Sequence, residues 1–338
     1  MNTHKLLLSP AASFATAPAP HQIFNPENLR QASIKELARR LNFRPIQHSD
    51  MATIWPLLKN APGRTTDFSY AGLLMWVDYF NYEFAILNDT LFIKGKVEND
   101  LSTPAFSIPV GNMPIDFSVA ILREYCKSHD MQLEFSAVPE CVIDDIKALN
   151  PTSIEPLDDW SDYLYSAESL ATLSGKKYSK KRNHVNQFLT AYPDWELLPL
   201  EGIYIEQALS FMDLIDAEGD DTPMAQAERD LNRRVLRMLE EGDEIMEGAV
   251  LTDGHGKLLG FTIGDVKDDT LFVHIEKAQH ATPGGFEMLN KSFAAMMKER
   301  HPEIQYINRE DDAGDPGLRY AKESYRPIEL LKKYNVVF

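Results

Sequence analysis

Ala-Val-Leu-Thr-Asp-Gly-His-Gly-Lys-Leu-Leu-Gly-Phe-Thr-Ile-Gly-Asp-Val, residues 249–266, is the stretch that decides the fold class. Two apolar runs flank Asp253-Gly254-His255-Gly256. A glycine-rich turn between two such runs is a strong signal for a β-hairpin. We therefore expect antiparallel strands at 249–252 and 258–266, with a third strand at 271–275.

The elements predicted around this hairpin form a series that occurs twice. In the second half, periodicity and turn residues predict the following elements: strand 196–200, helices 205–217 and 225–240, helix 286–299, strand 304–308 and helix 317–325. In the first half they predict these: helix 33–41, strand 43–47, helix 51–59, an apolar stretch 70–80 that is helical or mixed, strands 84–87, 91–94 and 106–110, helix 115–129, strand 132–137 and helix 140–149. We infer an α+β protein with a duplicated domain, divided into a tail (1–25) and two domains (26–155 and 156–338).

Composition limits the function classes. The chain has 338 residues, 44% of them apolar, and a formal net charge of −17, which argues against sequence-independent binding of bulk DNA or RNA. The two cysteines, Cys126 and Cys141, suggest neither a disulfide framework nor a metal cluster. No run approaches the roughly 18 apolar residues that a membrane helix needs. We expect a cytoplasmic protein and leave its oligomeric state open.

The first residues loosely resemble a secretory signal, because Lys5 precedes a short leucine run and Ala15-Thr16-Ala17 follows. Ser9 and Pro10 interrupt the apolar run. We favour a disordered, alanine- and proline-rich tail over residues 1–25.

A cationic stretch, Gly175–Leu189, stands out in this acidic chain. It contains no acidic residue, and its five positive charges are Lys176, Lys177, Lys180, Lys181 and Arg182. On a helical wheel an apolar side lies next to a basic side, which suits a helix that presents cations to phosphates or carboxylates. A basic, solvated surface helix is the alternative.

A second polar stretch begins at residue 307, where a predicted strand ends in Asn308-Arg309-Glu310-Asp311. Such an end delivers polar side chains to the edge of a sheet. Glu310 or Asp311 could deprotonate an amine nucleophile, while Arg309 and Lys322 could bind phosphate or carboxylate. An acidic loop with ordinary surface ion pairs is the alternative. No spacing of cysteine and histidine suggests a metal site, and we interpret isolated histidines such as His274 as structural.

The element order resembles the N-acetyltransferase fold. In that fold a Gln/Arg-x-x-Gly-x-Gly/Ala loop binds the pyrophosphate of coenzyme A at a helix N-terminus. The corresponding run here is Gln279-His-Ala-Thr282-Pro283-Gly284, in which Thr282 replaces a glycine and Pro283 removes one N–H donor. A different acyl carrier is therefore a serious option.

The two polar stretches together resemble an uncharacterised bacterial family related to the C-terminal domain of phosphatidylglycerol lysyltransferase. The lysyltransferases share an Arg-x-x-x-Asn pattern (Arg182, Asn186) and a Lys-x-x-aromatic-x-Pro pattern (Lys322, Tyr325, Pro327). The resemblance implies two tandem acetyltransferase-like (GNAT-type) domains, with mostly antiparallel sheets flanked by helices. It also implies transfer of an aminoacyl group from charged tRNA to an amine or hydroxyl.

These features predict an acyl- or aminoacyltransferase whose active site lies in the second domain, near the domain interface. The donor is aminoacyl-tRNA or acetyl-CoA, no further cofactor is required, and the acceptor is an unknown small molecule, peptide or lipid. Glu310 and Asp311 are the catalytic candidates; the donor-binding candidates are Lys176, Lys177, Lys180, Lys181, Arg182, Asn186, Arg309, Lys322 and Tyr325. A coenzyme A-dependent N-acetyltransferase and a non-enzymatic nucleotide- or RNA-end-binding module are the alternatives.

Overall fold

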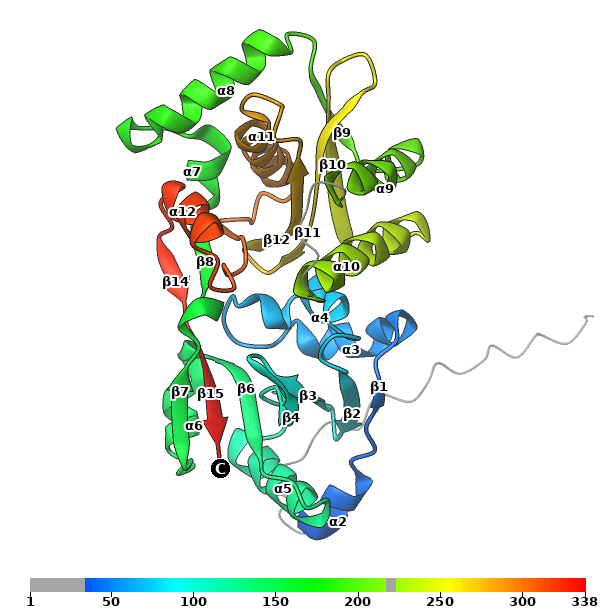
Figure 1. Ribbon diagram of the computed structural model, residues 1–338. Coiled ribbons are helices and arrows are strands. Elements are labelled where there is room, and N and C mark those ends of the chain that lie inside the picture. Colours follow the sequence, from blue (N-terminus) through cyan, green and yellow to red (C-terminus); the bar gives the residue numbers. More distant parts are fainter. Residues whose placement is uncertain (1–33, 217–222) are drawn as a thin grey trace, which may run out of the picture.

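The computed structural model describes residues 34–216 and 223–338 and shows two β-sheets, each flanked by helices (Figure 1). The predicted tail, residues 1–25, lies outside the described residues. The first sheet contains β1 (Arg44–Pro45), β2 (Glu83–Leu87), β3 (Thr90–Val97), β4 (Asp100–Phe106), β5 (Val110–Gly111), β6 (Glu134–Pro139), β7 (Ser153–Pro156) and β15 (Lys333–Val337). The second contains β8 (Asp162–Ser166), β9 (Glu196–Pro199), β10 (Met246–Thr252), β11 (Leu258–Lys267), β12 (Thr270–Ala278), β13 (Tyr306–Asn308) and β14 (Glu329–Leu331).

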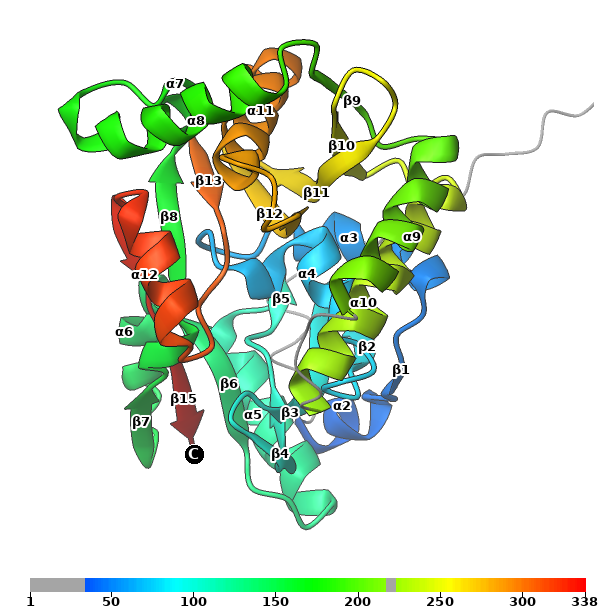
Figure 2. The same ribbon diagram turned by 45° about the horizontal axis from the view of Figure 1, so that its top comes forward.

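Helices cover both sheets. They are α2 (Ile34–Arg40), α3 (Met51–Leu58), α4 (Tyr70–Met75), α5 (Ile115–Ser128), α6 (Ile143–Lys147), α7 (Ala167–Thr172), α8 (Ser179–Ala191), α9 (Ile203–Asp216), α10 (Pro223–Glu240), α11 (Gly285–Arg300) and α12 (Pro316–Ser324). A 3-10 turn, η5 (Lys176–Tyr178), precedes α8. In the turned view, α9 and α10 lie on one side of the second sheet and α7, α8 and α11 on the other (Figure 2).

The two sheets have the same strand order. The first runs β1-β2-β3-β4-β6-β15-β7 and the second β9-β10-β11-β12-β13-β8-β14. In each, a parallel pair, β4–β6 or β12–β13, interrupts an otherwise antiparallel arrangement. The predicted α+β fold with two acetyltransferase-like halves is therefore confirmed.

The two halves exchange strands. The strand after β7 in the chain, β8, lies in the second sheet between β13 and β14. The strand after β14, β15, lies at the equivalent position in the first sheet, between β6 and β7. Residues 333–337 thus pair with β6 and β7, although the sequence-based division places all of residues 156–338 in the second domain. A strand of five residues carries no local signal for which distant strand it will pair with.

One hydrophobic core also crosses the boundary. Leu74 of α4 and Val235 of α10 belong to the same buried cluster as Phe261 of β11 and Phe135 of β6. A second cluster lies under α7 and α11, on the opposite face of the second sheet. The first half therefore packs on the α10 side of the second sheet and brings α4 to the ends of its strands.

Candidate active site

The loop Arg309–Asp311 follows β13 at the junction of the two halves, and its backbone is held on several sides. The N–H of Arg309 donates to the carbonyl of Tyr163 (3.1 Å), and the N–H of Tyr163 donates to the carbonyl of Glu310 (3.0 Å). The buried ammonium of Lys322 donates to the carbonyls of Arg309 (2.6 Å) and Asp311. Lys322, predicted to bind the donor, thus uses its hydrogen bonds to hold this loop.

Asp311 is half-buried at this junction, and burial raises its pKa to about 7. The carboxylates of Asp162 and Glu310 also raise this pKa, against the effect of Lys333. A carboxyl group with a pKa near the working pH exchanges a proton readily in both directions. Asp311 therefore has the proton affinity that a general base for an amine needs.

Three further carboxyl groups surround Lys333 beside Asp311; we call Asp67, Glu98, Asp162 and Asp311 the junction carboxylates. The ammonium of Lys333 lies 2.8 Å from Asp162 Oδ1 and 3.0 Å from Asp67 Oδ2. Burial raises the pKa of Glu98 to about 8. Asp162 is buried and the other three are half-buried, and Lys333 contacts only two of the four, so the group favours a cation over an anion.

His274 lies next to this loop between two carboxylates. Its side chain is completely buried, with Nε2 2.6 Å from Asp265 Oδ1 and Nδ1 2.8 Å from Glu310 Oε1. Burial by itself lowers the pKa of His274, but Asp265 and Glu310 outweigh burial and raise the pKa to about 10. The ring is therefore an imidazolium at neutral pH.

Two cations contact the ring of Tyr325. The ammonium of Lys181 is 3.7 Å from the ring centroid, and the guanidinium of Arg309 is 4.7 Å from it. Arg309 also pairs with Glu276 (2.9 Å) and Lys181 with Glu287 (3.3 Å). The structure thus brings the predicted residues Arg309, Lys181 and Tyr325 together, although protein groups already contact both cations.

Among the other predicted residues of the cationic stretch, Arg182 is hydrogen-bonded to the backbone and the rest are exposed. Nη1 of Arg182 donates to the carbonyls of Leu173 (2.5 Å) and Gly175 (2.6 Å), so this guanidinium stabilises the turn before α8. The remaining predicted residues of η5 and α8 are exposed: Lys176, Lys177, Lys180 and Asn186. Neither Lys176 nor Lys180 pairs with an acidic side chain within the described part of the chain.

Helix α8 covers the start of α11, where the acetyltransferase fold places the pyrophosphate loop. Gly284, the N-cap of α11, has a left-handed φ of 67°. A Cβ atom on Gly284 would lie 2.0 Å from the carbonyl oxygen of His184 in α8. The backbone of α8 therefore occupies the space next to this loop.

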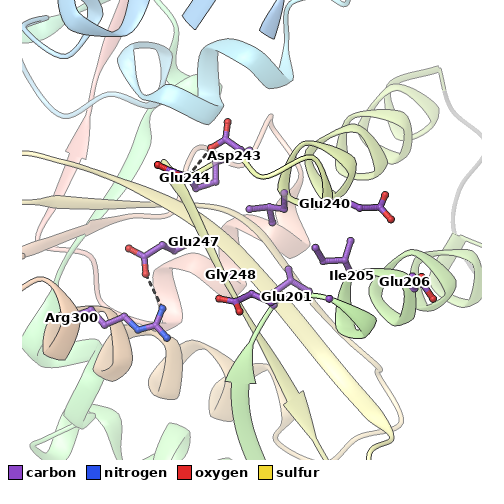
Figure 3. Close-up of a pocket in the computed structure, with 13 residues that line it drawn as sticks. Glu201, Ile205, Glu206, Glu240, Asp243, Glu244, Glu247, Gly248 and Arg300 are labelled. Carbon is purple, nitrogen blue, oxygen red and sulfur yellow. Dashed lines mark hydrogen bonds and ion pairs between the residues drawn. The ribbon is translucent and has the colours of Figure 1, made fainter. Parts of the chain in front are cut away.

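A separate pocket of about 450 Å³ lies at the start of α9, the end of α10 and the start of β10, and Figure 3 shows the residues that line it. Acidic side chains dominate its lining: Glu201, Glu206, Glu240, Asp243, Glu244 and Glu247, with Arg300 paired to Glu247. None of the predicted site residues lines it. This pocket and the junction carboxylates are therefore two different acidic regions.

Comparison with known proteins identifies the family. The family described as "Phosphatidylglycerol lysyltransferase, C-terminal" matches residues 60–337. The chain belongs to this family. A conserved protein of unknown function from Bacteroides thetaiotaomicron is similar in structure, with 29% identity and a TM-score of 0.77 over 88% of this chain and 99% of that one.

A more distantly similar solved structure shares the fold, and one further relative matches in sequence. L-PGS from Bacillus licheniformis is 14% identical, with a TM-score of 0.60 over 87% of this chain and 92% of that one. An uncharacterized protein of Mycoplasmoides gallisepticum is 25% identical over 177 residues, and the chain spans 56% of that relative's length. Between residues 34 and 338, leaving out 217–222, no helix combines the length and apolar character of a membrane span.

Sequence reasoning missed several residues of the junction in this family member. They are Asp67, Glu98, Asp162, Asp265 and Lys333. Sequence reasoning also did not predict that His274 carries a charge. One signal was available: Asp265 and His274 flank the turn of a predicted hairpin, which brings them close together. Asp67, Glu98, Asp162 and Lys333 come together only because β15 joins the first sheet and the two halves pack against each other.

Proposed function

We propose that this protein is an aminoacyltransferase that moves the aminoacyl group of a charged tRNA to an amine or hydroxyl acceptor. Membership of the phosphatidylglycerol lysyltransferase C-terminal family supports a transferase. The reaction takes place at the junction of the two halves, beside Asp311. No covalent enzyme intermediate is needed, because the ester of a charged tRNA is already activated.

The observation that carries the choice of donor is the position of α8 over Gly284. Coenzyme A would place its pyrophosphate against the start of α11, where the carbonyl of His184 already lies. The exposed lysines 176, 177 and 180 instead present their charges outward, where they can bind phosphates of an extended RNA. Both features favour tRNA over coenzyme A.

In the proposed reaction the acceptor nitrogen or oxygen attacks the carbonyl carbon of the aminoacyl ester, and Asp311 takes the proton that the acceptor loses. The bond between this carbon and the terminal ribose oxygen breaks, and Asp311 passes the proton on to that oxygen, which leaves as the ribose hydroxyl. The junction carboxylates favour a cationic amino group near the reacting ester. Lys322 and His274 keep the loop of Asp311 in place.

The test offers the protein two labelled donors, a mixture of tRNAs charged with ¹⁴C-amino acids and [¹⁴C]acetyl-CoA. The acceptors are phosphatidylglycerol vesicles and a primary amine. We expect label to leave the RNA, with kcat/KM rising through about pH 7 as Asp311 ionises. Asp311→Asn should lower the rate about 10²- to 10⁴-fold, whereas Asp144→Asn, an exposed control, should not.

Consumption of acetyl-CoA alone would reject the tRNA donor. Binding of RNA without any turnover would instead support a non-enzymatic RNA-end-binding module.

A further inference from the structure

We propose that His274 is a positioning residue that ties the start of α4, in the first half, to the loop that carries Asp311, in the second. The bridge consists of three consecutive contacts, from α4 to Asp265, from Asp265 to His274 and from His274 to Glu310, and the first of them crosses between the halves. The proposal rests on the proposed function only for the role of Asp311.

The first contacts join α4 to Asp265 of β11. The N–H groups of Tyr70 and Ala71 donate to the carboxylate of Asp265 at 3.3 and 3.0 Å. Asp265 is completely buried, so this carboxylate needs partners on every side. It therefore holds the first turn of α4 against the second sheet.

The next contacts pass through His274 to the loop. Each ring nitrogen of His274 faces a carboxylate oxygen, Asp265 on one side and Glu310 on the other. Two carboxylates can both accept only if both ring nitrogens carry protons. The imidazolium is thus a charged link between two acidic groups that would otherwise repel each other.

Glu310 needs such support. Its φ of 58° is left-handed, and a residue with a side chain keeps this conformation only where its surroundings impose it. The side chain of Asn308 accepts a hydrogen bond from the backbone of Glu310, and His274 holds its carboxylate. Because Asp311 is the next residue, loss of the bridge should let both turn away from the junction.

NMR of the ¹⁵N-histidine-labelled full chain tests the bridge without any substrate. At pH 8, where an ordinary histidine is neutral, both ring nitrogens of His274 should be protonated. A neutral His274 at pH 8 would overturn the proposal. This outcome does not depend on whether the protein transfers aminoacyl groups.

Hydrogen exchange then tests the coupling in His274→Gln. The matched control is His301→Gln, because His301 also contacts two carboxylates, Glu247 and Glu303, at the end of α11. In His274→Gln we expect exchange at Ala71 and at residues 309–314 to quicken at least tenfold, with the rest of the second sheet unchanged. A uniform loss of protection would show that His274 only contributes to global stability. Unchanged protection would show that it holds neither segment, and either result would overturn the proposal.

Kinetics complete the experiment. His274→Gln and Asp265→Asn should lower kcat at least tenfold while the donor KM stays within about twofold, and His301→Gln should change neither. A fall in rate that follows only the loss of folded protein would overturn the proposal. If the wild type transfers nothing, the proposed function fails, while NMR and hydrogen exchange still decide the bridge.

Discussion

The ammonium nitrogen of Lys333 lies 2.8 Å from the carboxylate of Asp162, and this pair joins the last strand of the chain to the first strand of the second sheet. Both side chains are almost completely buried, and Asp67 is the second partner of Lys333. Burial lowers the pKa of Lys333, but Asp162 and Asp67 outweigh burial and raise it well above its usual value. The lysine is therefore charged throughout the physiological range.

Lys333→Met should strongly destabilise the protein, because it leaves Asp162 and Asp67 buried without a cation. Removing one partner of a buried pair costs about 3–5 kcal/mol. Urea unfolding measures the change. Lys332→Met is the control, since Lys332 is half-exposed and its replacement should cost no more than about 0.5 kcal/mol. Equal effects at 332 and 333 would contradict the prediction.

Stability should fall between pH 6.5 and about 10 because of His274. The folded-state pKa is about 10 and the ordinary value is 6.5, so the folded state holds a proton that the unfolded state loses in this window. The contribution is complete below pH 6.5 and declines by about 1.4 kcal/mol per pH unit up to the folded pKa.

His274→Gln should show a shallower decline when unfolding free energy is measured against pH. Asp311 and Glu98, whose pKa values are also raised, remain in both proteins, so the difference between the two curves reports His274. Parallel curves for wild type and variant would show that His274 is not charged in the folded state.

Gly284→Ala should be more destabilising than Gly256→Ala. Both glycines have a left-handed φ, so both substitutions cost roughly 1–2 kcal/mol of backbone strain. Only at Gly284 does the new Cβ meet backbone, the carbonyl of His184 at 2.0 Å, whereas nothing lies within 4 Å at Gly256. We expect an additional loss of about 1–3 kcal/mol at Gly284. Equal losses in thermal unfolding would mean that α8 moves away freely.

Replacing Lys176, Lys177 and Lys180 together by alanine should weaken tRNA binding with little change in stability, about 0.5 kcal/mol or less per exposed charge. The slope of log affinity against log salt should become shallower, since fewer phosphates are neutralised. The control removes three other exposed lysines, Lys59, Lys127 and Lys257. Equal binding by both triple variants in fluorescence anisotropy would mean that η5 and α8 present only a solvated surface.

The local elements of the second half could be predicted from the sequence because their signals are local. The hairpin at 249–266 appears as β10 and β11, and the helix expected at 286–299 is α11. In the first half, the strands expected at 84–87 and 91–94 appear in β2 and β3, and Asn88 and Asp89 between them have the left-handed φ of a tight hairpin turn.

Other elements depend on contacts far away in sequence. The strand expected at 106–110 is wrong: β4 runs from Asp100 to Phe106, and its polar start carries little strand signal. The stretch 70–80, expected to be helical or mixed, is an α-helix only as far as Met75. Strands β14 and β15 were missed, since each is short and only its neighbours in the sheets stabilise it.

The candidate site also contains both residues that a local sequence signal predicts and residues that only distant contacts bring in. Glu310, Asp311, Arg309, Lys322 and Tyr325 were named from one polar stretch and lie together. Lys322 and Arg182 donate to backbone carbonyls, which their charge could not reveal. Asp67 and Glu98 come from the first half and join the site only when the two halves pack.

The exchange of β8 and β15 between the sheets has a consequence for the order in which a newly made chain can fold. A two-domain protein usually folds its N-terminal domain first during synthesis. Here the first sheet is incomplete until residues 333–337 leave the ribosome, because β15 lies between β6 and β7. Nascent chains stalled before residue 333 should therefore be degraded by a protease that the released protein resists. Until β15 has been made, β6 and β7 present unpaired strand edges, so each new chain passes through an aggregation-prone stage that lasts until residues 333–337 are available.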